Sequence, residues 1–168
     1  MYKHCPNCGA TYSPADYAPE KIHCQKCQFD FYLSPKPCNA LIIENDHGDI
    51  LLVKRKFDPG KGKWDVPGGF IDPQETLEES SSREAMEELG VHIGGVEYCA
   101  SYPSTYLFQG ITSSILNFIV KARITGGTLT AGDDAEEFHF FSEQEIPWDK
   151  LAFDYLHEAL KDYLRLRK

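Results

Sequence analysis

The chain has 168 residues, of which 42% are hydrophobic, enough for one enzyme-sized domain and a small appendage. Its formal charge of −9 argues against a general polyanion binder, because nucleic-acid affinity normally rests on basic patches. The first ten residues do not form a signal peptide, and no apolar run is long enough to cross a bilayer. We therefore expect a soluble, cytoplasmic protein without a membrane partner.

Four cysteines fall into two close pairs, Cys5 with Cys8 and Cys24 with Cys27. The spacing C-x2-C-x15-C-x2-C lies in the range of four-cysteine zinc sites, whose closed tetrahedron leaves no position for water. Two disulfides are the less favoured reading in a cytoplasmic chain. We predict that residues 1–37 form a zinc ribbon held by structural Zn²⁺, and that residues 38–168 form a second domain.

The second domain begins with two apolar runs that predict strands at Cys38–Glu44 and Asp49–Lys56, joined in a hairpin by the turn Asn45–Gly48. Further strands and a C-terminal helix are predicted from the same patterns at Trp64–Phe70, Val96–Tyr102, Ile111–Ile124, Glu137–Phe141 and Phe153–Arg167. Another helix follows Thr76, which opens a capping box with Glu79, and ends before Gly90. The fold class is α+β.

This second helix carries a cluster of carboxylates. Glu84, Glu87 and Glu88 stand at i, i+3 and i+4, so they share one face. Like charges at this spacing cost a few tenths of a kcal/mol per pair, and a divalent cation would reverse that effect. An acidic face is by itself usually only solvated surface. Ala85 and Leu89 form a separate apolar stripe, so we expect the helix to pack on the sheet with its acidic face open.

From Gly69 to Val91 the sequence GFIDPQETLEESSSREAMEELGV resembles the Nudix box, G-x5-E-x7-R-E-U-x-E-E-x-G-U, where U is a bulky aliphatic residue. The matching positions are Gly69, Glu75, Arg83, Glu84, Glu87, Glu88, Gly90 and Val91. The one departure is Ala85, a smaller residue at the first U position.

The resemblance implies a Nudix α/β/α sandwich that hydrolyses a nucleoside diphosphate linked to another group. It implies that Glu84, Glu87 and Glu88 bind Mg²⁺ or Mn²⁺, and that Arg83 orients a glutamate of the box. The Gly69 carbonyl is our own candidate for a further metal ligand. Glu88 is our first choice as the general base or as a metal ligand. The resemblance also implies a small-molecule nucleotide as the partner and allows a homodimer.

A zinc ribbon before a Nudix domain resembles the NADH pyrophosphatase family, which carries S-Q-P-W-P-F-P-x-S ten residues after its box. At that place the chain matches the motif only at Ser101, Pro103 and the aromatic Tyr106. Tyr106 is therefore a candidate substrate-binding residue. The implied substrates are NADH, NAD or an ADP-ribose-like compound.

Two candidates lie outside the box. Arg55, in a basic stretch before it, is predicted to contact substrate phosphates. The acidic run DDAEE ends at Glu137 and offers Glu136 and Glu137 as alternative general bases. Glu137 is the better aligned of the two, although an exposed acidic turn explains it as well.

Two other functions stay open. A non-catalytic Nudix-like sensor would bind a nucleotide without cleaving it. An RNA-cap hydrolase would use the ribbon to present a capped RNA end, although residues 1–37 hold only four basic against three acidic residues.

Overall fold

The computed structural model describes residues 2–108, 110–132 and 135–167. Its strands and helices follow one another in the order β1 (Lys21–His23), β2 (Asp30–Tyr32), β3 (Lys36–Ile43), β4 (Ile50–Arg55), β5 (Trp64–Asp65), α1 (Leu77–Leu89), β6 (Val91–Phe108), β7 (Ile111–Gly127), β8 (Ala135–Phe141) and α2 (Asp154–Leu166), with short 3-10 turns at Pro14–Asp16 and Trp148–Lys150. None of the described helices is long and apolar enough to cross a membrane.

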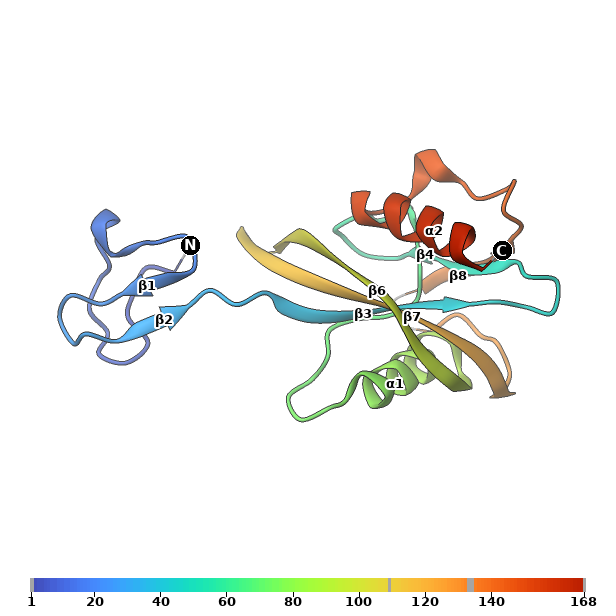
Figure 1. Cartoon of the computed structure of the whole chain (residues 1–168), viewed down its shortest axis with the longest axis horizontal. Helices are drawn as coiled ribbons and strands as arrows, with labels where there is room; N and C mark the ends of the chain where they lie inside the picture. Colours follow the sequence, from blue (N-terminus) through green and yellow to red (C-terminus); the bar gives the residue numbers. More distant parts are fainter. Residues whose placement is uncertain (1, 109, 133–134, 168) are drawn as a thin grey trace.

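The first strands form a small lobe at one end of the molecule, joined to the rest by an extended segment that leads into β3 (Figure 1). β1 pairs with β2 in an antiparallel sheet. The lobe has its own cluster of buried residues, Cys5, Tyr12, Ile22 and Cys24. Such a cluster is far too small to order a segment by hydrophobic burial alone.

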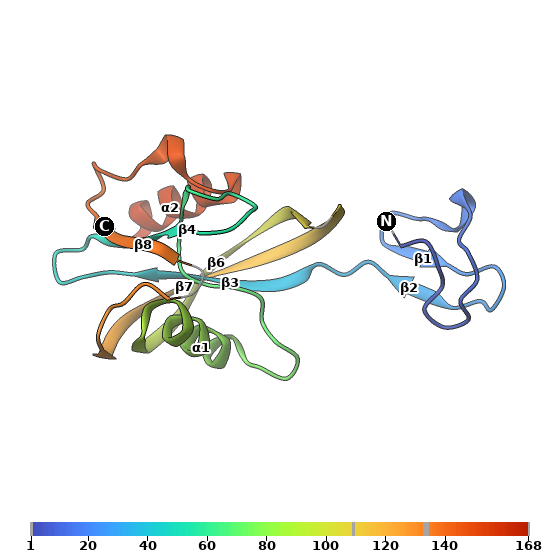
Figure 2. The same cartoon turned by 180° about the vertical axis from the view of Figure 1, so that it is seen from behind.

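The main body holds two three-stranded sheets with the strand orders β3-β7-β6 and β5-β4-β8. β3 runs parallel to β7, and the long β6 pairs antiparallel with β7. The two helices lie on opposite sides of these sheets, as Figure 2 shows from behind.

Alternate residues of β3 explain this sandwich, because successive side chains of a strand point to opposite faces. Leu41 and Ile43 pack with Ala85 and Leu89 of α1. Ala40 and Ile42 pack instead in a second cluster with α2, for example with Leu160. The apolar run of β3 is thus buried on both faces, and the predicted α+β sandwich is confirmed.

The predicted hairpin at the start of the domain is wrong, because β3 and β4 belong to different sheets. The turn itself exists: the Asn45 side chain accepts hydrogen bonds from the backbone N–H groups of His47 and Asp49. After the turn, an isolated bridge pairs Glu44, just past β3, with Ile50 at the start of β4. The apolar side chains of both strands are buried on both faces. Each strand therefore packs between other elements, and the two strands separate into different sheets.

α1 begins and ends as its sequence predicts. The Thr76 hydroxyl accepts a hydrogen bond from the Glu79 N–H at 3.2 Å, and the Glu79 carboxylate accepts one from the Thr76 N–H at 2.8 Å. Gly90 closes the helix in the left-handed conformation with φ 68°. β6 starts at Val91, earlier than the predicted Val96, because the chain enters the strand directly from this turn.

Candidate active site and metal centre

A cleft of about 440 Å³ opens beside α1, a size typical of small-molecule sites. Its walls come from β3, β4, β6, β7, the turn after β5, α1 and the start of α2. It brings together most of the residues expected to act on substrate or metal, namely Arg55, Gly69, Arg83, Glu84, Glu87, Glu88 and Tyr106.

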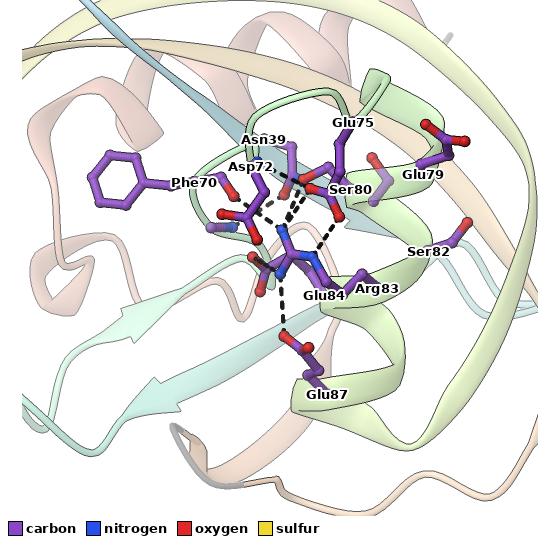
Figure 3. Close-up of polar contacts among 12 residues, drawn as sticks. Asn39, Phe70, Asp72, Glu75, Glu79, Ser80, Ser82, Arg83, Glu84 and Glu87 are labelled. Atoms are coloured by element: carbon purple, nitrogen blue, oxygen red, sulfur yellow. Dashed lines mark hydrogen bonds and ion pairs between the residues drawn. The ribbon is translucent and has the colours of Figure 1, made fainter.

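Arg83 is the centre of the polar network on α1 (Figure 3). Its Nε and Nη2 donate to the two oxygens of Glu75 at 2.7 and 2.9 Å. Its Nη1 donates to Glu84 at 2.8 Å and to Glu87 at 3.1 Å, and Nη2 also reaches the Phe70 carbonyl at 3.0 Å. The guanidinium therefore ties the loop before the helix to two of the three clustered carboxylates.

The carboxylates of this network have opposite pKa shifts. The hydrogen bonds from Arg83 lower the pKa of Glu75 to about 2, with a contribution from the backbone N–H of Asp72. Burial raises the pKa of Glu84 despite the nearby Arg83, because only 8% of the residue is exposed. The expectation that the whole acidic face lies open is wrong for Glu84, while Glu87 is exposed.

The double glycine after β5 lets the backbone approach the carboxylates closely. A Cβ on Gly69 would clash with Glu84 Oε1. The Gly68 N–H donates to Glu88 Oε2 at 3.1 Å, which orients that carboxylate toward the turn. Gly68 has φ 142°, a conformation that other residues rarely adopt.

Asn39 holds this turn in place, and sequence reasoning missed it. Its Oδ1 accepts from the Gly69 N–H at 3.1 Å, its N–H donates to the Gly69 carbonyl at 2.8 Å, and its Nδ2 donates to Ser80 Oγ at 2.7 Å. Asn39 is 1% exposed. A polar residue within the apolar run of β3 was the signal that could have identified it.

The chemistry of the donors suits a hard divalent cation, since the carboxylates of Glu84, Glu87 and Glu88 all line the cleft. Arg83 lies between Glu84 and Glu87, and in the described chain only the cysteines gather three or more metal-ligating atoms within 4.8 Å. Binding of a cation by all three glutamates requires side-chain movement. Glu87 has room for it, because its side chain is 59% exposed.

Arg55 also lines the cleft and pairs with Asp65, its Nη1 lying 2.9 Å from Asp65 Oδ2. Burial raises the pKa of Asp65 to about 6, although Arg55 acts in the opposite direction. Sequence reasoning missed Asp65, an acidic residue within the apolar stretch around β5. Such a residue is rarely buried unless it is paired.

Aromatic rings also line the cleft. The ring centre of Tyr106 lies 5.9 Å from that of Phe70 and 6.3 Å from that of Phe153. Phe70 is 40% exposed, so this group offers an accessible apolar surface in the same cleft as the carboxylates. A planar ring of a ligand could pack there.

Glu137 lies elsewhere. Its carboxylate pairs at 3.1 Å with the Nζ of Lys54, a residue of β4. Glu137 is not among the described residues that line the cleft. Its role as a general base stays a prediction.

The four cysteines of the lobe converge. The sulfurs of Cys5 and Cys27, and those of Cys8 and Cys24, are 3.7 Å apart, and all four lie within 4.8 Å of one another. Thiolates at the usual Zn–S distance of about 2.3 Å form a tetrahedron with edges of about 3.8 Å. The cluster therefore has the size and the soft donors that a zinc ion requires.

Each pair of cysteines sits on a tight turn. The Gly9 N–H donates to the Cys5 carbonyl at 2.9 Å, and the Gln28 N–H donates to the Cys24 carbonyl at 2.7 Å. Both closing residues adopt positive φ, 70° and 61°. These turns let two sulfurs of one turn reach the same point.

Comparison with known proteins agrees with this geometry. The NUDIX domain family matches residues 35–163. The chain is 37% identical over 146 residues to an ADP-ribose pyrophosphatase of Methanocaldococcus jannaschii, covering 82% of this chain and 78% of that relative. It is 25% identical to the NAD-capped RNA hydrolase NudC of Escherichia coli O1:K1 / APEC over 87% of this chain, but spans only 54% of that relative.

A solved structure has the same arrangement over nearly the whole length. The crystal structure of a NUDIX hydrolase from Nitrosomonas europaea superposes with a TM-score of 0.73 at 32% identity, covering 99% of this chain and 92% of that chain. The fold and the family match therefore point to the same family. The chain belongs to the NUDIX domain family and is a Nudix hydrolase.

Proposed function

We propose that this protein hydrolyses the diphosphate linkage of an ADP-ribose-like substrate with Mg²⁺ or Mn²⁺, and that Zn²⁺ on the four cysteines orders its N-terminal lobe. The observation that carries the proposal is one cleft that joins clustered carboxylates to an arginine and an aromatic wall. The relative named as an ADP-ribose pyrophosphatase supports this substrate class.

Hydrolysis of a diphosphate adds water across one P–O–P bridge, so one phosphorus gains the water oxygen and the other keeps the bridging oxygen. A divalent cation on Glu84, Glu87 and Glu88 would neutralise charge on the phosphoryl oxygens and favour an ionised water. The neighbouring Gly69 carbonyl is a further candidate ligand. The chain's own part is to gather these oxygen donors in one cleft.

Individual residues then have distinct roles. Arg83 ties Glu84 to Glu75 and so fixes the helix against the loop before it. Glu88, oriented by the Gly68 N–H, accepts the proton of the attacking water. Arg55 meets a phosphate oxygen through charge-assisted hydrogen bonds, and Tyr106 packs against a ring of the substrate.

The test is a substrate panel with purified protein and Mg²⁺ or Mn²⁺, containing ADP-ribose, NADH, NAD, nucleotide sugars and nucleoside triphosphates. ADP-ribose should be cleaved with the highest kcat/KM, yielding AMP and ribose 5-phosphate identified by mass. Preferred cleavage of NADH to AMP and reduced nicotinamide mononucleotide would keep the chemistry but reject the substrate. Binding without any turnover would favour the nucleotide sensor.

A capped RNA end is the second candidate, because the relatives named as NAD-capped RNA hydrolases match most of this chain. Residues 1–37 carry a net charge of only +1, which gives little electrostatic affinity for RNA. If the lobe presented RNA, cleavage of NAD-capped RNA should exceed that of NAD and fall steeply with salt. Equal rates on the two substrates would reject this role of the lobe.

A further inference from the structure

Arg55 is held in place from several sides. Its Nη1 donates to Asp65 Oδ2 at 2.9 Å, and its Nε donates to the Pro59 carbonyl at 2.7 Å. Its guanidinium carbon lies 5.0 Å from the ring centre of Phe153. The loop after β4 also folds back onto the side chain, since a Cβ on Gly60 would come within 3.3 Å of Arg55 Cδ. The guanidinium is therefore fixed before any ligand binds.

Asp65 is the buried part of this arrangement. Only 6% of the residue is exposed, and its Oδ1 accepts a hydrogen bond from the Val66 N–H at 2.9 Å. The titratable groups around it are Arg55 on β4, Cys38 on β3 and Tyr155 on α2. Burial raises the pKa of both the Cys38 thiol and the Tyr155 hydroxyl, so Arg55 supplies the compensating charge.

A buried carboxylate that is paired with a single positive charge contributes little to the free energy of unfolding. Desolvation of the two ions costs several kcal/mol per ion and often cancels their attraction. The partner of Asp65 lines the cleft, however, and the side chain of Arg55 keeps 24% of its surface exposed. Within the described part of the chain, the hydrogen bonds of the guanidinium use Nε and Nη1, while Nη2 donates to no described acceptor.

We propose that Asp65 is a positioning residue, which fixes the guanidinium of Arg55 so that the remaining N–H groups of Arg55 meet a phosphate oxygen of the substrate. The inference rests on the proposed function, because it assumes an anionic diphosphate in this cleft. Asp65 acts through Arg55 and touches no substrate. A planar donor that is already oriented loses less side-chain entropy on binding, so the pair strengthens substrate affinity.

The test is a double-mutant cycle with Asp65→Asn, Arg55→Gln and both changes together, assayed for kcat and KM with ADP-ribose and Mg²⁺. Asp65→Asn should raise KM about tenfold and change kcat less than about threefold. A tenfold rise in KM is what the loss of one well-placed charge-assisted hydrogen bond to the substrate would cause. In the Arg55→Gln background, Asp65→Asn should have no further effect on KM. If Arg55→Gln does not fold, Arg55→Lys replaces it, because the ammonium group of lysine lacks the planar, two-pronged geometry that Asp65 would orient.

Asp162→Asn is the matched control. Asp162 also pairs with an arginine, Arg165, at 2.9 Å, but it lies on α2 outside the residues that line the cleft. Its substitution should leave KM unchanged. An unchanged KM in Asp65→Asn, or an equal rise of KM in both Arg55 backgrounds, overturns the positioning role.

Binding of inorganic pyrophosphate with Mg²⁺, measured by calorimetry, separates this inference from the proposed function. If the wild type cleaves no diphosphate but Asp65→Asn binds pyrophosphate about tenfold more weakly, the hydrolase proposal fails and the positioning role stands. If the wild type cleaves ADP-ribose and both variants match it in KM and in pyrophosphate affinity, the positioning role fails alone.

Discussion

Replacing Glu84 with glutamine should remove most of the turnover and leave the fold intact. Glu84 Oε1 accepts a hydrogen bond from Arg83 at 2.8 Å, and the residue is 8% exposed. Glutamine has nearly the same shape, and its amide oxygen can accept the same hydrogen bond. The change removes a buried negative charge without opening a cavity, so the metal-free free energy of unfolding should stay within about 1 kcal/mol of wild type.

The catalytic cation, by contrast, loses a charged ligand. We expect kcat/KM to fall by about 10²- to 10³-fold, equivalent to about 3 to 4 kcal/mol of transition-state stabilisation. Mg²⁺ at about 100 times its Kd should stabilise the wild type by about 2.7 kcal/mol, or roughly 5 to 10 °C in Tm for a chain of this size. Glu84→Gln should lack that shift.

The assays are turnover of ADP-ribose and thermal unfolding with and without MgCl₂. Glu78→Gln serves as the control, because Glu78 is an exposed glutamate on the same helix and does not line the cleft. Glu84→Gln that kept turnover within about threefold of wild type, or kept the Mg²⁺-induced rise in Tm, would contradict the metal-site reasoning.

Four further predictions follow from the same structure. Gly69→Ala should fold but lose at least about tenfold in kcat/KM, because its Cβ displaces the carboxylate of Glu84 at the end of a flexible side chain; an unchanged rate would refute this close approach. Asn39→Ala should lower the free energy of unfolding by about 2 to 3 kcal/mol in denaturant titration, because it leaves buried hydrogen-bonding groups without a partner; a loss below about 0.5 kcal/mol would contradict it. Cys24→Ser should lose the bound zinc in elemental analysis and become susceptible to proteolysis within residues 1–37, while the main body keeps its Mg²⁺-dependent Tm; full zinc content would argue against the four-cysteine site. Folding raises the pKa of Asp65 from 3.8 to about 6, so the folded state holds this proton more tightly than the unfolded state. As pH rises from about 4 to 6, the free energy of unfolding of the wild type should therefore fall by up to about 3 kcal/mol relative to that of Asp65→Asn. Parallel curves of unfolding free energy against pH for the two proteins would contradict this.

Local signals predicted α1 well. A capping box at Thr76 and a glycine at position 90 mark the ends of the helix, and both act within a few residues of sequence. The acidic face followed from the helical repeat. That Glu84 is nonetheless buried depends on the turn at Gly69, which packs against it from outside the helix.

Long-range pairing was less predictable. The apolar runs that became β3 and β4 look like the arms of a hairpin, yet β3 pairs with β7 and β4 pairs with β5 and β8. Which partner a buried strand takes depends on cover from both helices, and a short apolar run does not encode that choice.

The polar residues that support the site were missed for a similar reason. Asn39 and Asp65 lie within apolar stretches, where one polar residue gives no hint of its partner. Their partners, Ser80 and Arg55, are separated from them in sequence and meet them only in the folded chain. The glutamates of α1 are adjacent in sequence, so a pattern search finds them.

The most direct test of the central claim is incubation of the protein with ADP-ribose and Mg²⁺ in ¹⁸O-labelled water, with products identified by mass. Cleavage of the diphosphate predicts AMP and ribose 5-phosphate, one ¹⁸O atom in one of the two products, and no reaction when the divalent cation is chelated. Products from cleavage of any other bond, undiminished cleavage after the divalent cation is chelated, or no cleavage of any diphosphate substrate would contradict this function.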